Sequence, residues 1–357
     1  MITRCWGTTA LVLFAVTVIF SYFNIHIPAA LWWLDGVVWL GGAAVFLITR
    51  GMGLFVLRRL LETLFVVWVI ASATFLLLRT LPGGPFDSEK ALPPEIKKNI
   101  EAKYKLDQPL HRQYLDYMKG LTRGELGQSY KYVGRDISVI IGDSLPASLQ
   151  LGIYALIISY LIGIPLGVLA GWKQGSFLDS GGMFLAISGV SLPSFLMAQV
   201  FIQTFGFQGL NWFESAQWLG PEYYFLPMMV LGIRPAAVIA RLTRASVLEV
   251  IHSDYIRTAR AKGLDARSIL FKHVLRNSLI PVLMISGPLA AGILTGSFVI
   301  EQIFNVPGIS KHLISSVTNR DYPLILGTTL MFSLMLVLAN LVTDVLTAIV
   351  DPRVKTL

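Results

Sequence analysis

Apolar runs of about 20 residues recur along this chain, and no other feature of the sequence constrains its fold more strongly. A helix needs about 20 mostly apolar residues to cross the hydrocarbon core of a bilayer, where every backbone polar group must be hydrogen-bonded within the protein. Such runs lie at residues 8–24, 30–49, 60–81, 147–172, 181–207, 225–242, 280–304 and 323–350. The sequence therefore predicts an all-α, polytopic helical membrane protein.

The composition agrees with this class. Of the 357 residues, 54% are hydrophobic and 14% are charged, whereas about 25% of the residues of a soluble domain are charged. The formal net charge of +8 could indicate a nucleic-acid partner, but the basic residues are concentrated in predicted loops. Residues 241–276 hold eight basic residues against three acidic ones, and the positive-inside rule places them in the cytoplasm. We therefore expect this chain to lie in a lipid bilayer, and we do not expect it to bind nucleic acid.

Counting spans outward from residues 241–276 places both termini in the cytoplasm. The basic residues after the second span and at the end of the chain agree with this orientation: Arg50, Arg58, Arg59, Arg353 and Lys355. Residues 1–51 form an N-terminal extension with two predicted transmembrane helices, and this even number of crossings leaves the orientation of residues 52–357 unchanged. The single cysteine, Cys5, excludes an intrachain disulfide and a cysteine-based metal site.

One long polar segment, residues 82–146, interrupts the apolar runs. Its ten basic and nine acidic residues nearly cancel, and long loops of this kind cross the membrane despite their lysines. Two amphipathic helical patterns follow Pro93, at residues 95–106 and 108–121, and their apolar positions recur at helical spacing. These positions are Ile96, Ile100, Tyr104, Leu110, Tyr114, Leu115 and Met118. The pattern predicts a small extracytoplasmic helical insertion.

A second polar segment, residues 246–280, predicts two short cytoplasmic helices with a glycine break. Ser253 or Asp254 can cap the first helix, Gly263 can end it in the left-handed conformation, and Asp265 can cap the second, which runs to about Leu275. The second helix pairs an apolar face with basic side chains: Leu264, Ile269, Leu270 and Val274 beside Arg267, Lys272 and Arg276. Such a surface suits a groove in a partner protein or the lipid headgroups, and the pattern does not choose between them.

Two strings in this segment, YIRTARAKGL (Tyr255 to Leu264) and HVLRNSLIPV (His273 to Val282), resemble a known signature. It is the cytoplasmic loop of the inner-membrane permeases of binding-protein-dependent ABC importers, in the peptide and nickel branch. The resemblance runs from about Met52 to the C-terminus through LPGGPFD, SLPASLQLG, IGIPLGVLAG, ARLTRAS and GSFVIEQIFNVPGI, and is closest to the B subunit of oligopeptide permeases. Residues 1–51 have no counterpart in it, and Arg257-Thr258-Ala259 stands where the broader motif begins Glu-Ala-Ala.

The resemblance implies a six-helix permease domain at residues 52–357, which translocates peptides across the bacterial inner membrane by alternating access. It also implies that residues 246–280 couple to a cytoplasmic ATPase through Tyr255, Arg257, Thr258, Ala259, Arg260, Ala261, Lys262, Gly263, Leu264, His273, Arg276 and Asn277. The implied partners are a second homologous permease subunit, two cytoplasmic ATPase subunits and a periplasmic peptide-binding protein.

The chain contains no Gly-x-x-x-x-Gly-Lys-Ser/Thr phosphate-binding loop. We therefore predict that it is not an enzyme and binds no cofactor itself, and that ATP and Mg²⁺ are used by the partner ATPase. Arg260 and Lys262 could pair with acidic groups on that partner.

Within the spans, small residues recur four positions apart, a spacing that allows close helix approach. They are Gly163, Gly167, Gly171, Gly292 and Gly296, and we favour helix packing over solute contact for them.

Arg234 also needs an explanation, because a charge at the centre of a spanning helix costs about 2.5 to 3.5 kcal/mol. We place it near the translocation path, where it could meet a peptide carboxylate.

Two other classes of function remain open at this point. A stand-alone channel or secondary transporter would need buried acidic residues for ion coupling, and beyond Asp344 and Glu62 the spans offer few. A membrane-embedded enzyme would need a nucleophile and a base at membrane depth, or metal-ligand spacing of His and Glu. The five histidines lie instead in loops or at span ends: His26, His111, His252, His273 and His312.

Overall fold

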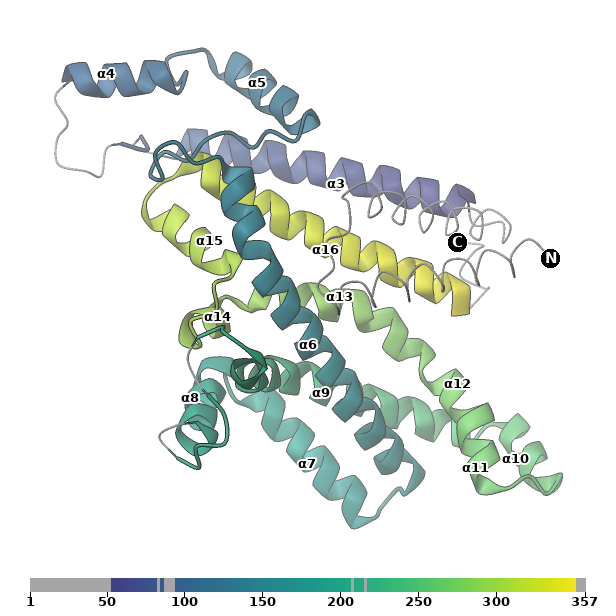
Figure 1. Cartoon of the computed structure of the whole chain (residues 1–357). Coiled ribbons are helices and arrows are strands. Elements are labelled where there is room, and N and C mark those ends of the chain that lie inside the picture. Colours follow the sequence, from purple (N-terminus) through teal and green to yellow (C-terminus); the bar gives the residue numbers. More distant parts are fainter. Residues whose placement is uncertain (1–52, 82–83, 87–93, 207–208, 215–216, 351–357) are drawn as a thin grey trace, which may run out of the picture. The chain divides into compact units, whose positions relative to one another are not determined.

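The computed structural model describes residues 53–81, 84–86, 94–206, 209–214 and 217–350 (Figure 1). In this part of the chain the regular structure is helical, with one isolated antiparallel bridge between Gln128 and Asp136. The spans predicted at residues 8–24 and 30–49 lie outside it. The chain divides into two compact units, residues 1–62 with 352–357 and residues 63–351. Of the first unit, the structure describes the start of α3 (Gly53–Thr80).

Five helices in the described ranges are long and apolar enough to cross a membrane, which confirms the polytopic all-α class. They are α3, α6 (Ile137–Trp172), α9 (Pro221–Ile251), α13 with α14 (Ile280–Gly296 and Phe298–Ile303) and α16 (Tyr322–Val350). A bent pair, α7 (Phe177–Ser191) and α8 (Ser194–Phe205), brings the count to six when it is taken as one span.

The bend between α7 and α8 corrects the prediction of one continuous helix at residues 181–207. The two helices meet at 110°. Pro193 has no backbone N–H to donate, and it disfavours the helical conformation of the residue before it. Leu192 accordingly has φ −82° and ψ 130°, an extended conformation that ends α7.

Two helices extend beyond their apolar runs because tertiary contacts bury the added turns. The helix predicted at 147–172 begins at Ile137, where Ile137 and Ile141 are buried with Ile309 of α15 (Ile309–Thr318) and Leu324 of α16. The helix predicted at 225–242 continues to Ile251, since Val247 is buried in the cluster that holds residues 254–278.

Glycines bring α6 and α9 together over most of their length. A Cβ atom added at Gly163 would lie 2.6 Å from the Ala236 carbonyl oxygen, and one added at Gly232 would lie 2.7 Å from that of Ala155. Gly167 and Gly171 face α9 in the same way. These contacts confirm that the first glycine series serves packing. Gly292 does not, because an added Cβ there would meet no described atom within 4 Å.

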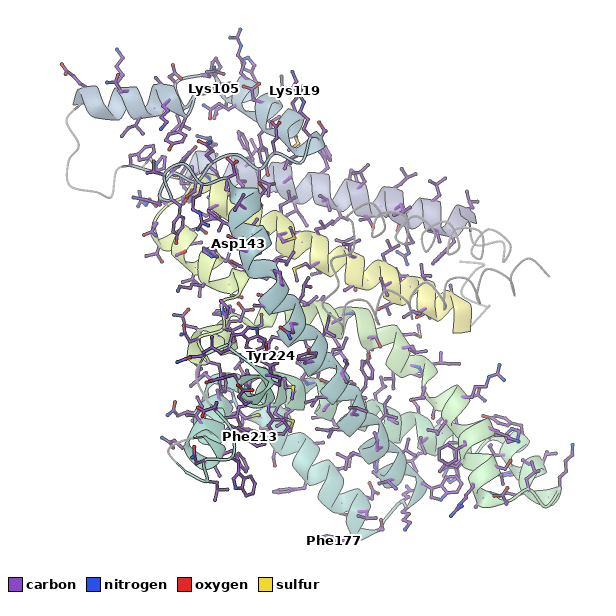
Figure 2. All side chains as sticks on the ribbon, viewed as in Figure 1. Lys105, Lys119, Asp143, Phe177, Phe213 and Tyr224 are labelled. Carbon is purple, nitrogen blue, oxygen red and sulfur yellow. The ribbon has the colours of Figure 1, made fainter. Side chains whose placement is uncertain are left out.

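The long polar segment folds into α4 (Pro94–Lys103) and α5 (Leu110–Thr122), as predicted. We call residues 94–136 the polar insert, on which Lys105 and Lys119 are labelled in Figure 2. The Tyr114 ring lies edge-on to Phe75 of α3, with ring centroids 5.5 Å apart, and its hydroxyl lies 2.8 Å from Ser72 Oγ, so this predicted apolar position does make a packing contact. Leu110 and Leu115 are exposed instead, and the predicted apolar face of α5 is only partly used.

Aromatic rings from the polar insert surround a cavity of about 180 Å³ beside α3 and α16. The ring centroids of Tyr104 and Tyr130 lie 4.6 Å apart, and the ring of Tyr117 stacks on that of Phe75. Burial raises the pKa of both Tyr117 and Tyr130 to about 12, so both phenols are neutral at physiological pH.

Candidate functional site

Residues 254–278 form a helical hairpin that connects α9 to α13 (Figure 1). It contains α10 (Asp254–Ala261), α11 (Ala266–Ser268), the π-helical turn η1 (Ile269–Val274) and α12 (Leu275–Ser278). The predicted order of helix, glycine break and helix is therefore confirmed. The hairpin packs on the C-terminal end of α6, whereas the polar insert precedes the N-terminal end of that helix.

Gly263 makes the turn between the two arms of the hairpin. Its φ of +75° lies in the left-handed region, and an added Cβ would meet nothing within 4 Å. The conformation of the backbone, not crowding, therefore selects glycine. Asp265 Oδ2 accepts a hydrogen bond from Ser268 N at 3.4 Å and caps the second arm as predicted. Ser253 occupies the cap position of α10, but its hydroxyl donates to the Val250 carbonyl oxygen.

The base of the hairpin is buried against the ends of α6 and α9. Ile256 and Ala259 of α10 form one cluster with Ile269 and Val274 of the second arm, and Val168 of α6 and Val247 of α9 complete it. Burying one such branched side chain contributes about 1.5 to 3 kcal/mol. The hairpin is therefore fixed to both helices.

This packing corrects the prediction for the apolar face of the second arm. Ile269 and Val274 were expected to face a partner protein or lipid headgroups, but both are buried within this chain. The two residues are five positions apart, and the π-helical turn, with its i to i+5 hydrogen bonds, places them on one side. Leu264 does remain on the surface, at 41% exposure.

Ten of the twelve predicted coupling residues are exposed on the hairpin: Tyr255, Arg257, Thr258, Arg260, Ala261, Lys262, Gly263, Leu264, Arg276 and Asn277. Ala259 is buried and His273 is half-buried, so these two support the hairpin from within. Asn277 Nδ2 donates to the Tyr255 hydroxyl at 2.8 Å and joins the two arms. The structure thus brings the predicted residues together in one element.

An exposed aromatic residue and unpaired charge complete this surface. Phe271 is 66% exposed, and the sequence analysis missed it because ILFKHV is apolar at too many positions for its helical period to indicate a face. Among residues 254–278, the structure shows one ion pair, between Arg257 and Asp254 at 3.6 Å. Arg260, Lys262 and Arg267 extend into solvent. The hairpin presents a basic surface with apolar side chains, which suits an acidic partner.

An ion pair near the hairpin was not predicted. Arg244 of α9 donates to both carboxylate oxygens of Asp179 in α7, at 2.5 and 2.9 Å. Asp179 also accepts a hydrogen bond from Gly175 N at 3.0 Å. A bidentate pair of this kind fixes orientation as well as distance. It holds the start of α7 against α9, about three turns before the hairpin.

Two further buried carboxylates lie away from the hairpin and also escaped prediction. Glu301 Oε1 accepts hydrogen bonds from the hydroxyls of Ser148 and Ser297 at 2.9 and 2.7 Å, and Oε2 accepts one from Ser310 N at 3.1 Å. Asp321 accepts hydrogen bonds from Ser129 Oγ and from Tyr130 N at 3.1 Å. Glu301 lies in the string GSFVIEQIFNVPGI quoted above, but no sequence pattern reveals that Ser148 donates to Glu301 or that Ser129 donates to Asp321, because these partners are distant in the chain.

Arg234, the other predicted site residue, is not part of the hairpin. It lies near the middle of α9 and is exposed, about 26 Å along the helix from its end at Ile251. In the described residues, no group of three or more His, Cys, Asp or Glu side chains could hold a metal ion.

Comparisons with known proteins give concordant matches. Residues 163–356 match a family described as "binding-protein-dependent transport system inner membrane component", and residues 52–151 match the N-terminal part of such membrane components. The chain is 41% identical to the dipeptide transport system permease protein DppB of Bacillus subtilis over 304 residues, which cover 85% of this chain and 98% of DppB. It is also 41% identical to the oligopeptide transport system permease protein OppB of Salmonella typhimurium, over 84% of this chain and 99% of OppB.

Proposed function

The chain belongs to the family of inner membrane components of binding-protein-dependent transport systems, and from this premise we propose that it is a permease subunit of an ATP-driven importer of peptides. The relatives described above are named dipeptide and oligopeptide permeases, and each is matched over nearly its whole length. This supports peptides, including oligopeptides, as the transported class.

One observation carries the mechanism: the helical hairpin has an exposed basic and apolar surface on a base buried against α6 and α9. We propose that this surface docks on a cytoplasmic ATPase. The hairpin continues directly from α9 and into α13. A displacement of the hairpin by the ATPase would therefore be transmitted to both helices and to α6, which is what alternating access requires.

The proposal includes four kinds of partner. A second homologous permease subunit would complete the path, two ATPase subunits would use ATP and Mg²⁺, and a periplasmic peptide-binding protein would deliver the solute. The hairpin holds the excess of basic residues that the positive-inside rule assigns to the cytoplasm. We propose the corresponding orientation, with both termini in the cytoplasm and the polar insert on the opposite side.

The proposal is tested by asking what co-purifies with the tagged protein after mild extraction from its native membrane. The variant is Gly263→Pro, because proline holds φ near −65° whereas Gly263 requires +75°. The matched control is Gly124→Pro in the polar insert, where φ is +77° and the surroundings are equally open. We expect ATPase and sister permease subunits with the wild type and with Gly124→Pro, and loss of the ATPase in Gly263→Pro.

Mass spectrometry gives the stoichiometry, and the thermal unfolding of each variant shows whether it is folded. Recovery of the chain alone from wild-type membranes would reject the importer and favour a stand-alone channel or secondary transporter. Equal recovery of the ATPase with folded Gly263→Pro would reject the hairpin as the docking element.

A further inference from the structure

The face of α9 that carries Arg234 differs in burial before and after this residue. Along the first half of the helix this face is covered, since Pro227, Val230 and Leu231 are buried. Along the second half Ala237 is still buried and Val238 is half-buried, but the two long polar side chains on this face, Arg234 and Arg241, are exposed. Arg234 is thus the first charged side chain beyond the covered half.

Arg234 is also close to the centre of the helix. It lies two residues before Ala236, the midpoint of Pro221–Ile251, which is about 3 Å along the axis. In the part of the chain that the structure describes, its guanidinium makes no hydrogen bond or ion pair with another residue. An arginine at this depth that faced lipid would be unfavourable, and such residues face a water-filled path or a protein partner.

We propose that Arg234 binds the C-terminal carboxylate of the transported peptide; this inference rests on the proposed function. Peptides of different sequence share a terminal carboxylate, so a path that accepts many peptides can use this group. The planar guanidinium binds a carboxylate through two parallel hydrogen bonds. One such contact in a hydrated path is also weak enough to release the solute, as translocation requires.

The other exposed arginine on this face has a different explanation and serves as the control. Arg241 follows Arg234 by seven residues, about 10 Å nearer the hairpin, and begins the basic segment that the positive-inside rule accounts for. The substitution Arg241→Met therefore removes the same charge from the same face without touching the proposed contact.

The experiment uses the complete importer, with its own partner subunits, in liposomes. Uptake is measured for one peptide with a free C-terminal carboxylate and for the same peptide as an amide. We expect Arg234→Met to reduce uptake of the free peptide about tenfold, the effect of losing one charge-assisted contact, and to leave the amide unchanged. In Arg241→Met the ratio of the two rates should equal that of the wild type.

A second measurement does not depend on selection by the binding protein. Cys5 is the only cysteine, so Cys5→Ser with Val238→Cys places one thiol a turn from Arg234 on the same face. A charged, membrane-impermeant thiol reagent should modify it, and the free peptide, but not the amide, should slow the reaction.

The outcomes separate the two levels of the proposal. If the wild-type importer takes up neither peptide, the proposed function is rejected. If it takes up both, and Arg234→Met slows them equally or disrupts the complex, Arg234 pairs with the sister permease and the inference is overturned. Failure of the charged reagent to modify the thiol at position 238 would overturn it as well, because the face would then be turned to lipid.

Discussion

Charged side chains within the long helices fall into two kinds, which differ in how they are satisfied. Glu301 is 2% exposed, and its two oxygens accept three hydrogen bonds from α6, α15 and the residue before α14. Arg234 is exposed and has no such partner among the described residues. A buried charge is tolerated when its donors are in place, so Glu301 is explained by structure. For Arg234, by contrast, we propose a ligand from outside the chain.

Glu301→Gln should destabilise the protein although the shape is conserved. A carboxamide has one acceptor oxygen instead of two, so it cannot satisfy the two hydroxyls and Ser310 N together. One buried donor left unpaired costs about 1 to 3 kcal/mol, and the thermal unfolding midpoint in detergent should fall. The neighbouring change Gln302→Glu, at an exposed position, should have little effect. Equal midpoints for Glu301→Gln and the wild type would show that the hydrogen bonds do not stabilise this site.

At the scale of elements, the contact between α6 and α9 depends on the absence of side chains. Ser159 Oγ also donates to the Gly232 carbonyl oxygen at 2.9 Å, a polar contact that is possible because the backbones are close. The two helices meet the hairpin at their far ends through Val168 and Val247. A shift of α9 is therefore transmitted to α6 along the whole contact.

Gly167→Ala tests how strictly this contact is packed. A methyl group at Gly167 would clash with the Ala240 carbonyl oxygen and with Thr243, and overpacking of this kind costs about 1 to 3 kcal/mol. Gly142→Ala on the same helix is the control, because a Cβ there meets nothing within 4 Å. Thermal unfolding should show a loss of stability in the first variant alone. Similar values for both would mean that the helices adjust at little cost.

At the scale of the whole molecule, the hairpin surface is the part of the described chain whose exposed groups best fit a soluble partner. Tyr255, Leu264 and Phe271 are exposed large apolar side chains among basic residues. In protein interfaces, aromatic anchors with a charged surround carry much of the binding energy. The assembly that we propose with the ATPase should therefore depend more on Phe271 than on any single lysine or arginine of the hairpin.

Phe271→Ser should weaken ATPase binding without unfolding the permease. The loss of an aromatic anchor at the centre of an interface costs about 2 kcal/mol or more, which corresponds to roughly a thirtyfold lower affinity. Affinity is measured between the detergent-solubilised permease and the purified ATPase. Leu115→Ser, at a comparably exposed position on α5 in the polar insert, is the control and should bind normally. Normal binding by Phe271→Ser would place the interface on another surface of the hairpin.

The sequence by itself determined the class of fold, the positions of the long apolar helices in the described residues and the location of the hairpin turn. These depend on local properties: the length of apolar runs, the charge of loops, the conformation that Gly263 permits and the cap that Asp265 provides. The sequence also indicated that a residue such as Arg234 requires an explanation, since the cost of a charge at membrane depth is a property of the helix alone.

Only the tertiary structure decided which faces are covered. The π-helical turn that buries Ile269 and Val274 together and the exposure of Phe271 both depend on neighbours distant in the chain. The same holds for Glu301, whose donors lie up to 153 positions away. The break at Pro193, by contrast, follows from the local chemistry of proline. In a chain whose helices are apolar on most sides, hydrophobic periodicity does not identify the packed face, because both lipid and protein accept apolar side chains.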